Sequence, residues 1–436
     1  MRINIENIGL IRQGSVFIDN VTVIAGVNDS GKSTIGKVLY STIKAGLNYE
    51  RDYNDYIIER LVRYSKSCYR QMRVYIERSS DEDTISEMSP TLFERRLKSS
   101  SFSIEKMCDV AKSYVYEVER ISSYMDTSAS FSRNISRMHE LIDSIYYRTS
   151  KDDLIGLTLM RNLTSEFNND ISTRYVKSPS IIELSEGRTE ILSCKFLKNK
   201  IVNVRMRDET MFEDVTYIES PLILNNIKNF SNMSGRNRDL VEKLTRSDSR
   251  YNGWYDENKI LKYAGEMEIR DRFELESMKL FNVIDGKLEY SIDDEKFYYK
   301  KNARTKFDID NVASGVKSFA MMGLLMSNNI LTEDSLLILD EPEVHLHPKW
   351  QIEYGRIICE LANRGIKVVV STHSPYMIQA INFFSNRILK GKVNYYLMDK
   401  YDDIYTRIED CTYDLNRIYK LLSEPIEALV WGDYNA

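Results

Sequence analysis

The stretch VTVIAGVNDSGKST, residues 21–34, decides the fold. Its first five residues are apolar or β-branched and end at a glycine, which predicts a strand buried inside a sheet. Residues 26–34 match the pattern G-x-x-x-x-G-K-[ST] in full, and a helical pattern begins in STIGKVLY. A strand, a glycine-rich loop and a helix in this order predict an α/β fold with a phosphate site at the start of the helix.

Each residue type in this loop suits a phosphate ligand. Gly26 and Gly31 let the backbone turn its N–H groups toward a β-phosphate. Lys32 offers a positive charge to the β- and γ-oxygens, and Ser33 offers a hydroxyl to Mg²⁺. The expected nucleotide-binding residues of the loop are Gly26, Asn28, Asp29, Ser30, Gly31, Lys32, Ser33 and Thr34.

A second stretch, LLILDEPEVHLHPKW at residues 336–350, permits two interpretations. Four apolar residues precede Asp340, as in a strand buried on both faces, so Asp340 would emerge at the end of that strand. Asp340 then fits the shell of a Mg²⁺ ion and Glu341 fits the base that orients an attacking water. The competing interpretation is a metal site at His345 and His347. A zinc hydrolase would require spacing such as HExxH, which is absent, and the nucleotide interpretation is favoured.

Two shorter motifs extend the predicted site. STHSP, residues 371–375, places His373 at the end of the strand KVVV, where it could sense a γ-phosphate. ASGVKS, residues 313–318, opens a strongly apolar helix, and the N-terminus of a helix that carries Ser314 and Gly315 is a second anion-binding surface. The alternative for Ser314 and Gly315 is an ordinary helix cap.

The remaining sequence divides the predicted core into two halves. RINIENIGLI and a following segment are expected as strands with a break at Gly14, and residues from Pro179 to about Asn225, including VTYIESPLIL, have strand texture. The expected organisation is 1–52 for the N-terminal half of the core, 53–178 for a helical insertion, 179–305 for a β-rich part with a polar surface excursion, and 306–436 for the C-terminal half.

The insertion carries two opposite stripes on its first helix. The apolar stripe is Ile58, Leu61, Cys68, Met72 and Tyr75. The basic stripe is Arg63, Lys66, Arg70 and Arg73. The basic stripe suits DNA, although acidic residues balance basic ones across the insertion, so a solvated helix face is the simpler interpretation.

Composition excludes several classes of protein. The 436 residues are 42% hydrophobic and 29% charged, with a net charge of −5, which argues against global disorder and against a protein that coats nucleic acid. Five scattered cysteines without CxxC spacing predict reduced thiols. The longest apolar run, FAMMGLLM, is too short to span a bilayer, and MRINIENIGLI lacks the features of a signal peptide. We therefore expect a cytoplasmic protein that uses no membrane.

Taken together, the motifs resemble those of the ABC-type ATPases of the SMC, RecF and OLD group. GVNDSGKST resembles Walker A, ASGVKS the signature motif, LLILDEPEVHLHP Walker B with the D-loop, and STHSP the switch-histidine segment. The resemblance implies an ABC-type α/β head in which a mixed or parallel sheet with flanking helices is interrupted by the helical insertion. It also implies ATP and Mg²⁺ as cofactors, with Lys32, Glu341 and His373 in catalysis.

The resemblance further implies an assembly. Ser314, Gly315 and Lys317 would contact the nucleotide bound at Lys32 of a second subunit, in a homodimer or a higher even-numbered oligomer. The EVHLHP segment would line that interface, which would account for its histidines without a metal.

Three departures from the group narrow this expectation. The signature is reduced to Ser-Gly-Val-Lys, which disfavours transport. No Q-loop glutamine is evident, because Gln71 is the only glutamine between the phosphate loop and the signature. The C-terminal tail lacks the spaced acidic motif of a Toprim nuclease domain. The chain thus resembles the compact ATPases of bacterial antiphage systems such as Septu and PARIS, which act with a separate nuclease or toxin. The alternative is a RecF-like ATPase that binds DNA in repair or recombination.

Overall fold

The computed structural model describes residues 1–79, 87–100, 103–146, 150–173, 176–207, 210–227, 233–245, 280, 283–301, 305–400 and 405–431. The chain divides into two compact units. The first unit consists of residues 1–47 and 159–436, and the second of residues 48–158. The boundary at residue 48 coincides with Asn48, whose backbone leaves the helical conformation inside a long helix. The compact helical unit is thus shorter than the 53–178 expected from sequence texture.

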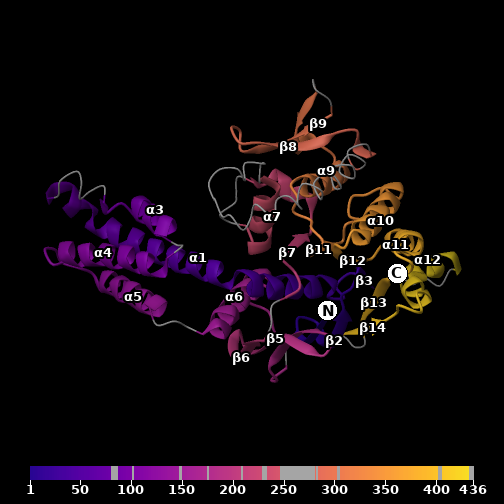
Figure 1. Cartoon of the computed structure of the whole chain (residues 1–436), viewed down its shortest axis with the longest axis horizontal. Coiled ribbons are helices and arrows are strands. Elements are labelled where there is room, and N and C mark those ends of the chain that lie inside the picture. The colour runs from indigo at the N-terminus through magenta and orange to yellow at the C-terminus, as the bar shows by residue number, and fades with distance from the viewer. Residues whose placement is uncertain are drawn as a thin grey trace, which may run out of the picture. The chain divides into compact units, whose positions relative to one another are not determined.

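The first unit contains one large sheet (Figure 1). Its 11 strands follow, in spatial order, as β6 (Lys200–Met206), β5 (Thr189–Leu197), β4 (Ser180–Glu186), β1 (Arg2–Ile8), β2 (Ile11–Phe17), β14 (Thr406–Asp410), β13 (Val393–Lys400), β3 (Val21–Gly26), β12 (Lys367–Thr372), β11 (Ser335–Asp340) and β7 (Asp214–Ile218). The strands from β13 to β7 are parallel, and those from β6 to β2 are antiparallel. The mixed sheet predicted for the fold class is confirmed.

The parallel strands bring the predicted motifs to one edge. Asp340 of β11 lies opposite Ser371 of β12, and Ser371 lies opposite Ile24 of β3. On the other side, Leu339 of β11 lies opposite Ile218 of β7. Because the carboxyl ends of parallel strands meet at the same edge, the phosphate loop, the DE pair and the STHSP segment emerge side by side.

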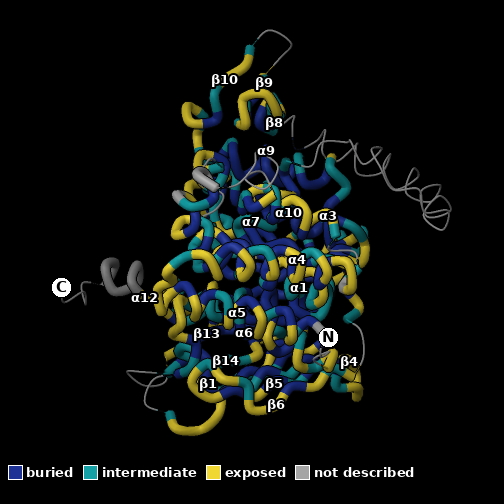
Figure 2. Tube along the Cα trace, turned by 90° about the vertical axis from the view of Figure 1, so that its left-hand side faces the viewer, coloured by how far each residue is buried: buried dark blue, intermediate teal, exposed yellow. Residues whose placement is uncertain are grey.

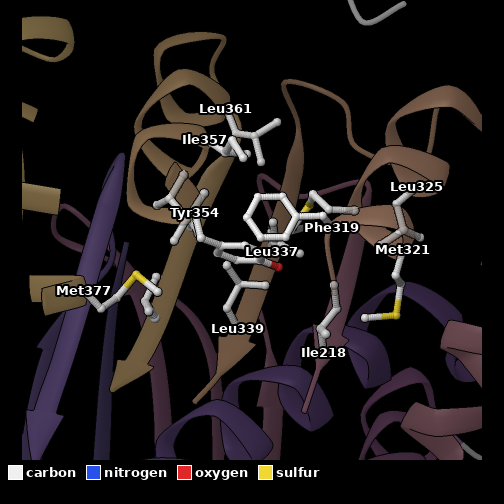
Figure 3. Close-up of a cluster of buried hydrophobic side chains, with 14 of the residues drawn as sticks. Ile218, Phe319, Met321, Leu325, Leu337, Leu339, Tyr354, Ile357, Leu361 and Met377 are labelled. Atoms are coloured by element: carbon white, nitrogen blue, oxygen red, sulfur yellow. The ribbon is translucent and has the colours of Figure 1, made fainter. Parts of the chain in front are cut away.

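Helices flank both faces of these strands. Within the described ranges, the helices of the first unit include the start of α1 (Lys32–Ser79), the end of α6 (Lys151–Glu166), α7 (Gly235–Thr245), α9 (Ser314–Ser327), α10 (Pro348–Asn363), α11 (Pro375–Ile388) and α12 (Asn416–Trp431), with the 3-10 helices η1 (Pro221–Asn225) and η4 (Ile309–Asn311). Leu337 and Leu339 belong to the core cluster shared with α9 and α10 (Figure 3). Ile338 points to the other face, where its side chain limits the space beside Gly36 of α1.

The strand β11 lies inside the core, because every residue of SLLILD is buried. Phe319 of α9 packs edge-on against Tyr354 and Trp350 of α10, at ring-centroid distances of 5.3 and 5.4 Å. Burial of a side chain of this size stabilises a fold by roughly 1.5–3 kcal/mol. The long apolar face of α9 therefore anchors it to α10 and the sheet.

The second unit is a helical bundle. It contains the later part of α1 with α3 (Pro90–Ser100), α4 (Ile104–Ser122) and α5 (Ala129–Tyr146), which share one apolar cluster. The predicted apolar stripe of α1 is confirmed, since its first four residues are buried and Tyr75 packs against the cluster. The four side chains of the predicted basic stripe are exposed.

Two expectations about strands are wrong. Gly14 does not break a strand but lies inside β2, opposite Ile5 of β1. Glycine is needed at this position because a Cβ there would come within 2.3 Å of Ile408. The chain instead turns at Gly9, whose φ is +55°. Residues 221–225 form η1 rather than a strand, since Pro221 starts a helical turn that the Ser220 side chain caps.

A small sheet forms a separate layer of the first unit. It runs β10 (Lys306–Asp308), β9 (Lys296–Lys300) and β8 (Lys287–Ser291), and few of its residues are buried (Figure 2). Of the predicted surface excursion after residue 230, the structure places α7, while residues 246–279 lie outside the described part. All five cysteines are buried and free, as expected for reduced thiols. In the described ranges no helix is both long and apolar enough to cross a membrane.

Candidate nucleotide-binding site

The loop between β3 and α1 leaves little room for side chains. A Cβ on Gly26 would lie 2.5 Å from the Met398 carbonyl oxygen and 2.9 Å from Ser30 Oγ. Gly31 has φ +85°, a left-handed conformation that favours glycine. Ser30 Oγ is buried and finds no hydrogen-bond partner in the described structure. An orphaned hydroxyl inside a glycine-rich loop before a helix fits a phosphate oxygen.

The other loop residues surround this position. Asn28 is exposed, and Asp29, with φ +59°, places its carboxylate 3.2 Å from Lys400 Nζ. Thr34 donates its backbone N–H to the Gly31 carbonyl oxygen at 3.0 Å, which fixes the first turn of α1. These residues form one compact loop, as predicted from the motif.

Lys32 is buried at the base of the loop. Its ammonium group donates to the Val27 carbonyl oxygen at 2.8 Å and lies 3.4 Å from Glu341 Oε1. The lysine of the first motif and the glutamate of the second, far apart in sequence, are therefore brought together.

Asp340 receives hydrogen bonds from three hydroxyl groups. Ser33 Oγ donates to Asp340 Oδ1 at 3.1 Å, Ser371 Oγ donates to the same oxygen, and the Tyr217 hydroxyl donates to Oδ2 at 2.6 Å. Asp340 is buried, and within the described ranges no lysine or arginine forms an ion pair with it.

This arrangement fits a magnesium ion. A buried carboxylate without an ion-pair partner is costly. The hydrogen-bond donors to Asp340 are neutral, while the Arg236 guanidinium interacts with it electrostatically without an ion pair. Carboxylate and hydroxyl oxygens are ligands that Mg²⁺ prefers. Asp340 and Ser33 would hold the ion, which when bound would supply positive charge beside the phosphate oxygens.

Glu341 has a strained backbone, with φ +50°, and its N–H donates to the Ser371 carbonyl oxygen at 2.9 Å. Its carboxylate is partly exposed and lies 3.5 Å from His373 Nδ1. A non-glycine residue in this conformation costs about 1–3 kcal/mol and commonly marks a functional site. The geometry suits a base that reaches into solvent beside the phosphate loop.

His373 is fixed by a residue to which sequence reasoning assigned no role. Glu343 is buried, and its Oε1 accepts from the Thr372 hydroxyl at 2.6 Å and from the His373 backbone N–H at 2.8 Å. The same oxygen lies 3.4 Å from His373 Nδ1. Glu343 thereby holds the chain after β12 so that the imidazole faces two carboxylates.

The signature segment stands apart from this group. Ser314 is the first residue of α9, and a Cβ on Gly315 would meet the Trp350 ring at 2.9 Å. The Lys317 ammonium group donates to Asn225 Oδ1 at 2.9 Å, and burial lowers the pKa of Lys317. Between the described parts of α9 and the phosphate loop no hydrogen bond or ion pair is present. The ordinary-cap alternative for Ser314 is wrong, because Ala313 holds the cap position without a side-chain hydrogen bond.

The two histidines that suggested a metal site have other surroundings. His347 caps α10, since its Nδ1 accepts from the Lys349 N–H at 3.3 Å. His345 is exposed and has φ +68°. No group of three or more histidine, cysteine, aspartate or glutamate side chains suited to a metal occurs in the part of the chain that the structure describes.

Three residues of the site escaped sequence reasoning. Tyr217 lies near the end of an unremarkable strand, Ser371 opens the STHSP segment but was given no role there, and Glu343 lies in LLILDEPEVHLHPKW without an assigned role. No local pattern distinguishes them, because each acts through a partner on another strand or loop.

Among protein families and curated proteins, the chain is similar to ATPases and their relatives. A family model described as an AAA ATPase domain matches residues 1–378.

The chain is 30% identical to an OLD nuclease of Thermus scotoductus over 83 residues, 19% of this chain and 16% of that protein. It is 30% identical to protein ea59 of Escherichia phage lambda over 101 residues, 21% of this chain and 18% of that protein. It is 36% identical to the Septu protein PtuA of Bacillus thuringiensis over 47 residues, 11% of this chain and 12% of that protein. The matches thus span less than a fifth of each relative, and they bear out the expected kinship with OLD-like ATPases.

Solved structures with similar traces include SMC head domains. The SMC head domain from Thermotoga maritima is 10% identical, covers 94% of this chain and 97% of its own, and has a TM-score of 0.36. An Smc head bound to the C-winged helix domain of ScpA is 9% identical, covers 95% and 98%, and has a TM-score of 0.41.

Proposed function

Since the chain belongs to the AAA ATPase domain family and is an ATPase, we propose that its ATP-dependent dimerisation regulates a separate effector protein, a nuclease or toxin, in bacterial antiphage defence. The observation that carries this proposal is a site assembled in two parts. Lys32, Ser33, Asp340, Glu341 and His373 converge within one chain, while the N-terminus of α9 lies apart from them.

The roles follow from the contacts. The phosphate loop and Lys32 would hold the ATP phosphates, and Ser33 with Asp340 would hold Mg²⁺. Glu341 orients the attacking water, with His373 beside it to sense the γ-phosphate.

The second part of the site would come from another copy of the chain. The start of α9 offers backbone N–H groups without a side-chain cap, which attract an anion. Ser314 and Gly315 would present these groups to the second nucleotide. Lys317 would add its charge only after leaving Asn225.

The proposal that a separate effector protein exists rests on similarity to known proteins. One relative is a nuclease by name and another is a Septu protein, and the sequence resembles ATPases that act with a separate toxic subunit. Co-purification with the products of neighbouring genes tests this step. A chain that retains none of them in any nucleotide state would count against an effector.

The switch itself is tested by molar mass in solution. Glu341→Gln should lower ATP turnover by about a thousandfold, because the general base is lost, while ATP binding persists. With ATP and Mg²⁺ this variant should shift to a dimer or a higher even-numbered species.

A charge at the start of α9 should abolish the shift. Ser314→Arg in the Glu341→Gln background should bind ATP but remain in the nucleotide-free assembly state. Ser327→Arg, at the exposed far end of the same helix, is the matched control and should still shift. A mass that ignores nucleotide, or equal effects of the two arginines, would count against dimerisation through α9.

A second candidate function is DNA binding, favoured by the exposed stripe of Arg63, Lys66, Arg70 and Arg73 on α1. Binding through phosphate contacts should weaken steeply with salt and disappear when the stripe is reversed to glutamate. Reversal of the exposed Arg95, Arg96 and Lys98 on α3 is the control. Equal losses in both variants, or no binding by the natural chain, would exclude the stripe as a DNA site.

A further inference from the structure

We infer that Tyr217 is a positioning residue for Asp340, whose carboxylate it orients for Mg²⁺. This inference rests on the proposed role of Asp340 in holding the ion. Tyr217 lies on β7 opposite Ile338 of β11, so its side chain reaches the end of the neighbouring strand. It is 2% exposed, and its hydroxyl donates to Asp340 Oδ2 at 2.6 Å.

The three hydroxyl donors divide unequally between the two carboxylate oxygens. Ser33 and Ser371 both donate to Oδ1, whereas Tyr217 is the donor to Oδ2 within the described structure. Loss of one serine would leave the other on Oδ1. Loss of the tyrosine hydroxyl would leave Oδ2 buried without a donor, which makes Tyr217 the residue that fixes the plane of the carboxylate.

The ring of Tyr217 has little freedom to move. Gly36 of α1 lies so close that a Cβ there would be 3.0 Å from Tyr217 Cε2. Tyr40 of α1 packs edge-on at a centroid distance of 6.1 Å. The guanidinium of Arg236 lies 4.6 Å from the ring centroid, within the range of a cation–π contact.

Arg236 is itself held firmly. It is buried on α7, its Nη2 donates to Glu219 Oε2 at 2.7 Å, and its Nε lies 2.9 Å from Glu166 Oε2 on α6. Burial raises the pKa of the Glu166 carboxyl, and the charge of Arg236 opposes that rise. The Tyr217 ring therefore packs against Arg236, which two carboxylates hold in place. This packing fixes the position of the Tyr217 hydroxyl.

A fixed carboxylate matters because of the chemistry of its partners. The Ser33 hydroxyl can bind a cation through a lone pair and still donate its proton to Asp340 Oδ1. Tyr217, a phenol that keeps its proton at neutral pH, satisfies the other oxygen without bringing a positive charge. The charge of Asp340 thus stays available to the ion, and outer partners of this kind tune metal affinity.

The test is Tyr217→Phe, which keeps the ring and removes the hydroxyl. The readout is the affinity for a fluorescent ATP analogue, titrated against Mg²⁺ and repeated in EDTA. Half-saturating Mg²⁺ should rise about tenfold, the scale on which outer partners of a metal ligand act. The affinity in EDTA should match that of the natural chain. Tyr396→Phe is the control, since it also deletes a buried hydroxyl, one that accepts from the Phe17 N–H at 2.9 Å, and it should change neither value.

Each outcome has a separate meaning. An unchanged Mg²⁺ requirement in Tyr217→Phe would overturn the inference, and so would an equal loss of affinity in EDTA, which would indicate a merely structural role. A natural chain whose nucleotide binding ignores Mg²⁺ would instead overturn the proposed function of Asp340.

Discussion

The acidic side chains at the two ends of β7 and its neighbours have opposite kinds of partner. At the carboxyl end, Asp340 is surrounded by the hydroxyl groups of Ser33, Ser371 and Tyr217. At the amino end, two aspartates meet two lysines. Lys44 Nζ lies 2.6 Å from Asp239 and 3.4 Å from Asp214, and Lys243 Nζ lies 2.7 Å from Asp214 and 3.0 Å from Asp239.

The difference separates aspartates paired with lysines inside the fold from Asp340, the carboxylate that we propose holds an ion. Lys243 also donates to the Val215 carbonyl oxygen at 2.7 Å and to the Thr216 hydroxyl at 3.0 Å. Its ammonium group is therefore bonded to β7, the outer strand of the sheet. The charges at this end cancel within the fold. At the other end the negative charge is retained, and a cation from solution can complete it.

The largest effect should come from Asp340→Asn. Removal of the unpaired charge should weaken Mg²⁺-dependent nucleotide binding by about a hundredfold, as for loss of a metal-site carboxylate and its network. The midpoint of thermal unfolding without nucleotide should stay the same or rise, because functional carboxylates of this kind commonly cost stability.

Calorimetry and the fluorescent-nucleotide titration check the two halves of this expectation. A variant whose thermal midpoint falls by several degrees while Mg²⁺ dependence survives would contradict the distinction between Asp340 and the aspartates that pair with lysines.

A smaller and opposite effect should come from Asp239→Asn. This change leaves two lysines with one aspartate in a largely buried network and should destabilise the fold by about 2 kcal/mol, because breaking a buried pair strands a charge. Nucleotide affinity with Mg²⁺ should be unchanged. Asp293→Asn, on an exposed turn, is the control and should alter neither quantity.

At acidic pH, Asp239 should no longer stabilise the fold. Burial raises the pKa of this carboxyl, but Lys243 and Lys44 outweigh burial and leave the pKa below its ordinary value of 3.8. A lowered pKa stabilises the fold above the unfolded value, and that stabilisation is lost as pH falls toward the folded value. The gap in thermal midpoint between the natural chain and Asp239→Asn should thus be constant from pH 7 to about pH 5 and narrow below about pH 4. A gap that widens in acid would show that the lysines do not act through this carboxylate.

Much of the fold was predictable where a short pattern carried the information. Residues 21–34 predicted a strand, loop and helix, and the structure contains β3, the loop and α1 at those positions. The apolar run before Asp340 predicted β11, and KVVV predicted β12. The prediction at Gly14 was wrong because glycine is needed there for another reason. The side chain of Ile408, on the distant strand β14, lies too close for a Cβ, and a local sequence pattern does not contain that contact.

The candidate site divides in the same way. The residue types of the phosphate loop, the DE pair and His373 were evident from motifs, because the chemistry of phosphate and Mg²⁺ demands particular groups at fixed spacing. Tyr217 and Glu343 were not, since a tyrosine in a strand and a glutamate in a turn have many ordinary uses. Their significance depends on the partner that each one meets.

The sequence by itself thus determined the parallel strands, the phosphate loop and the class of ligand, because these follow from neighbouring residues. Asp214, Asp239 and Asp340 are chemically alike in the sequence. Only the tertiary structure decided which of these carboxylates has lysine partners and which has hydroxyl partners alone. Lys243 follows Asp239 by four residues on α7, so that pair is local. Strand register and helix packing place Lys44 beside Asp214 and Asp239, and two of the hydroxyl groups beside Asp340, through contacts between residues more than a hundred positions apart.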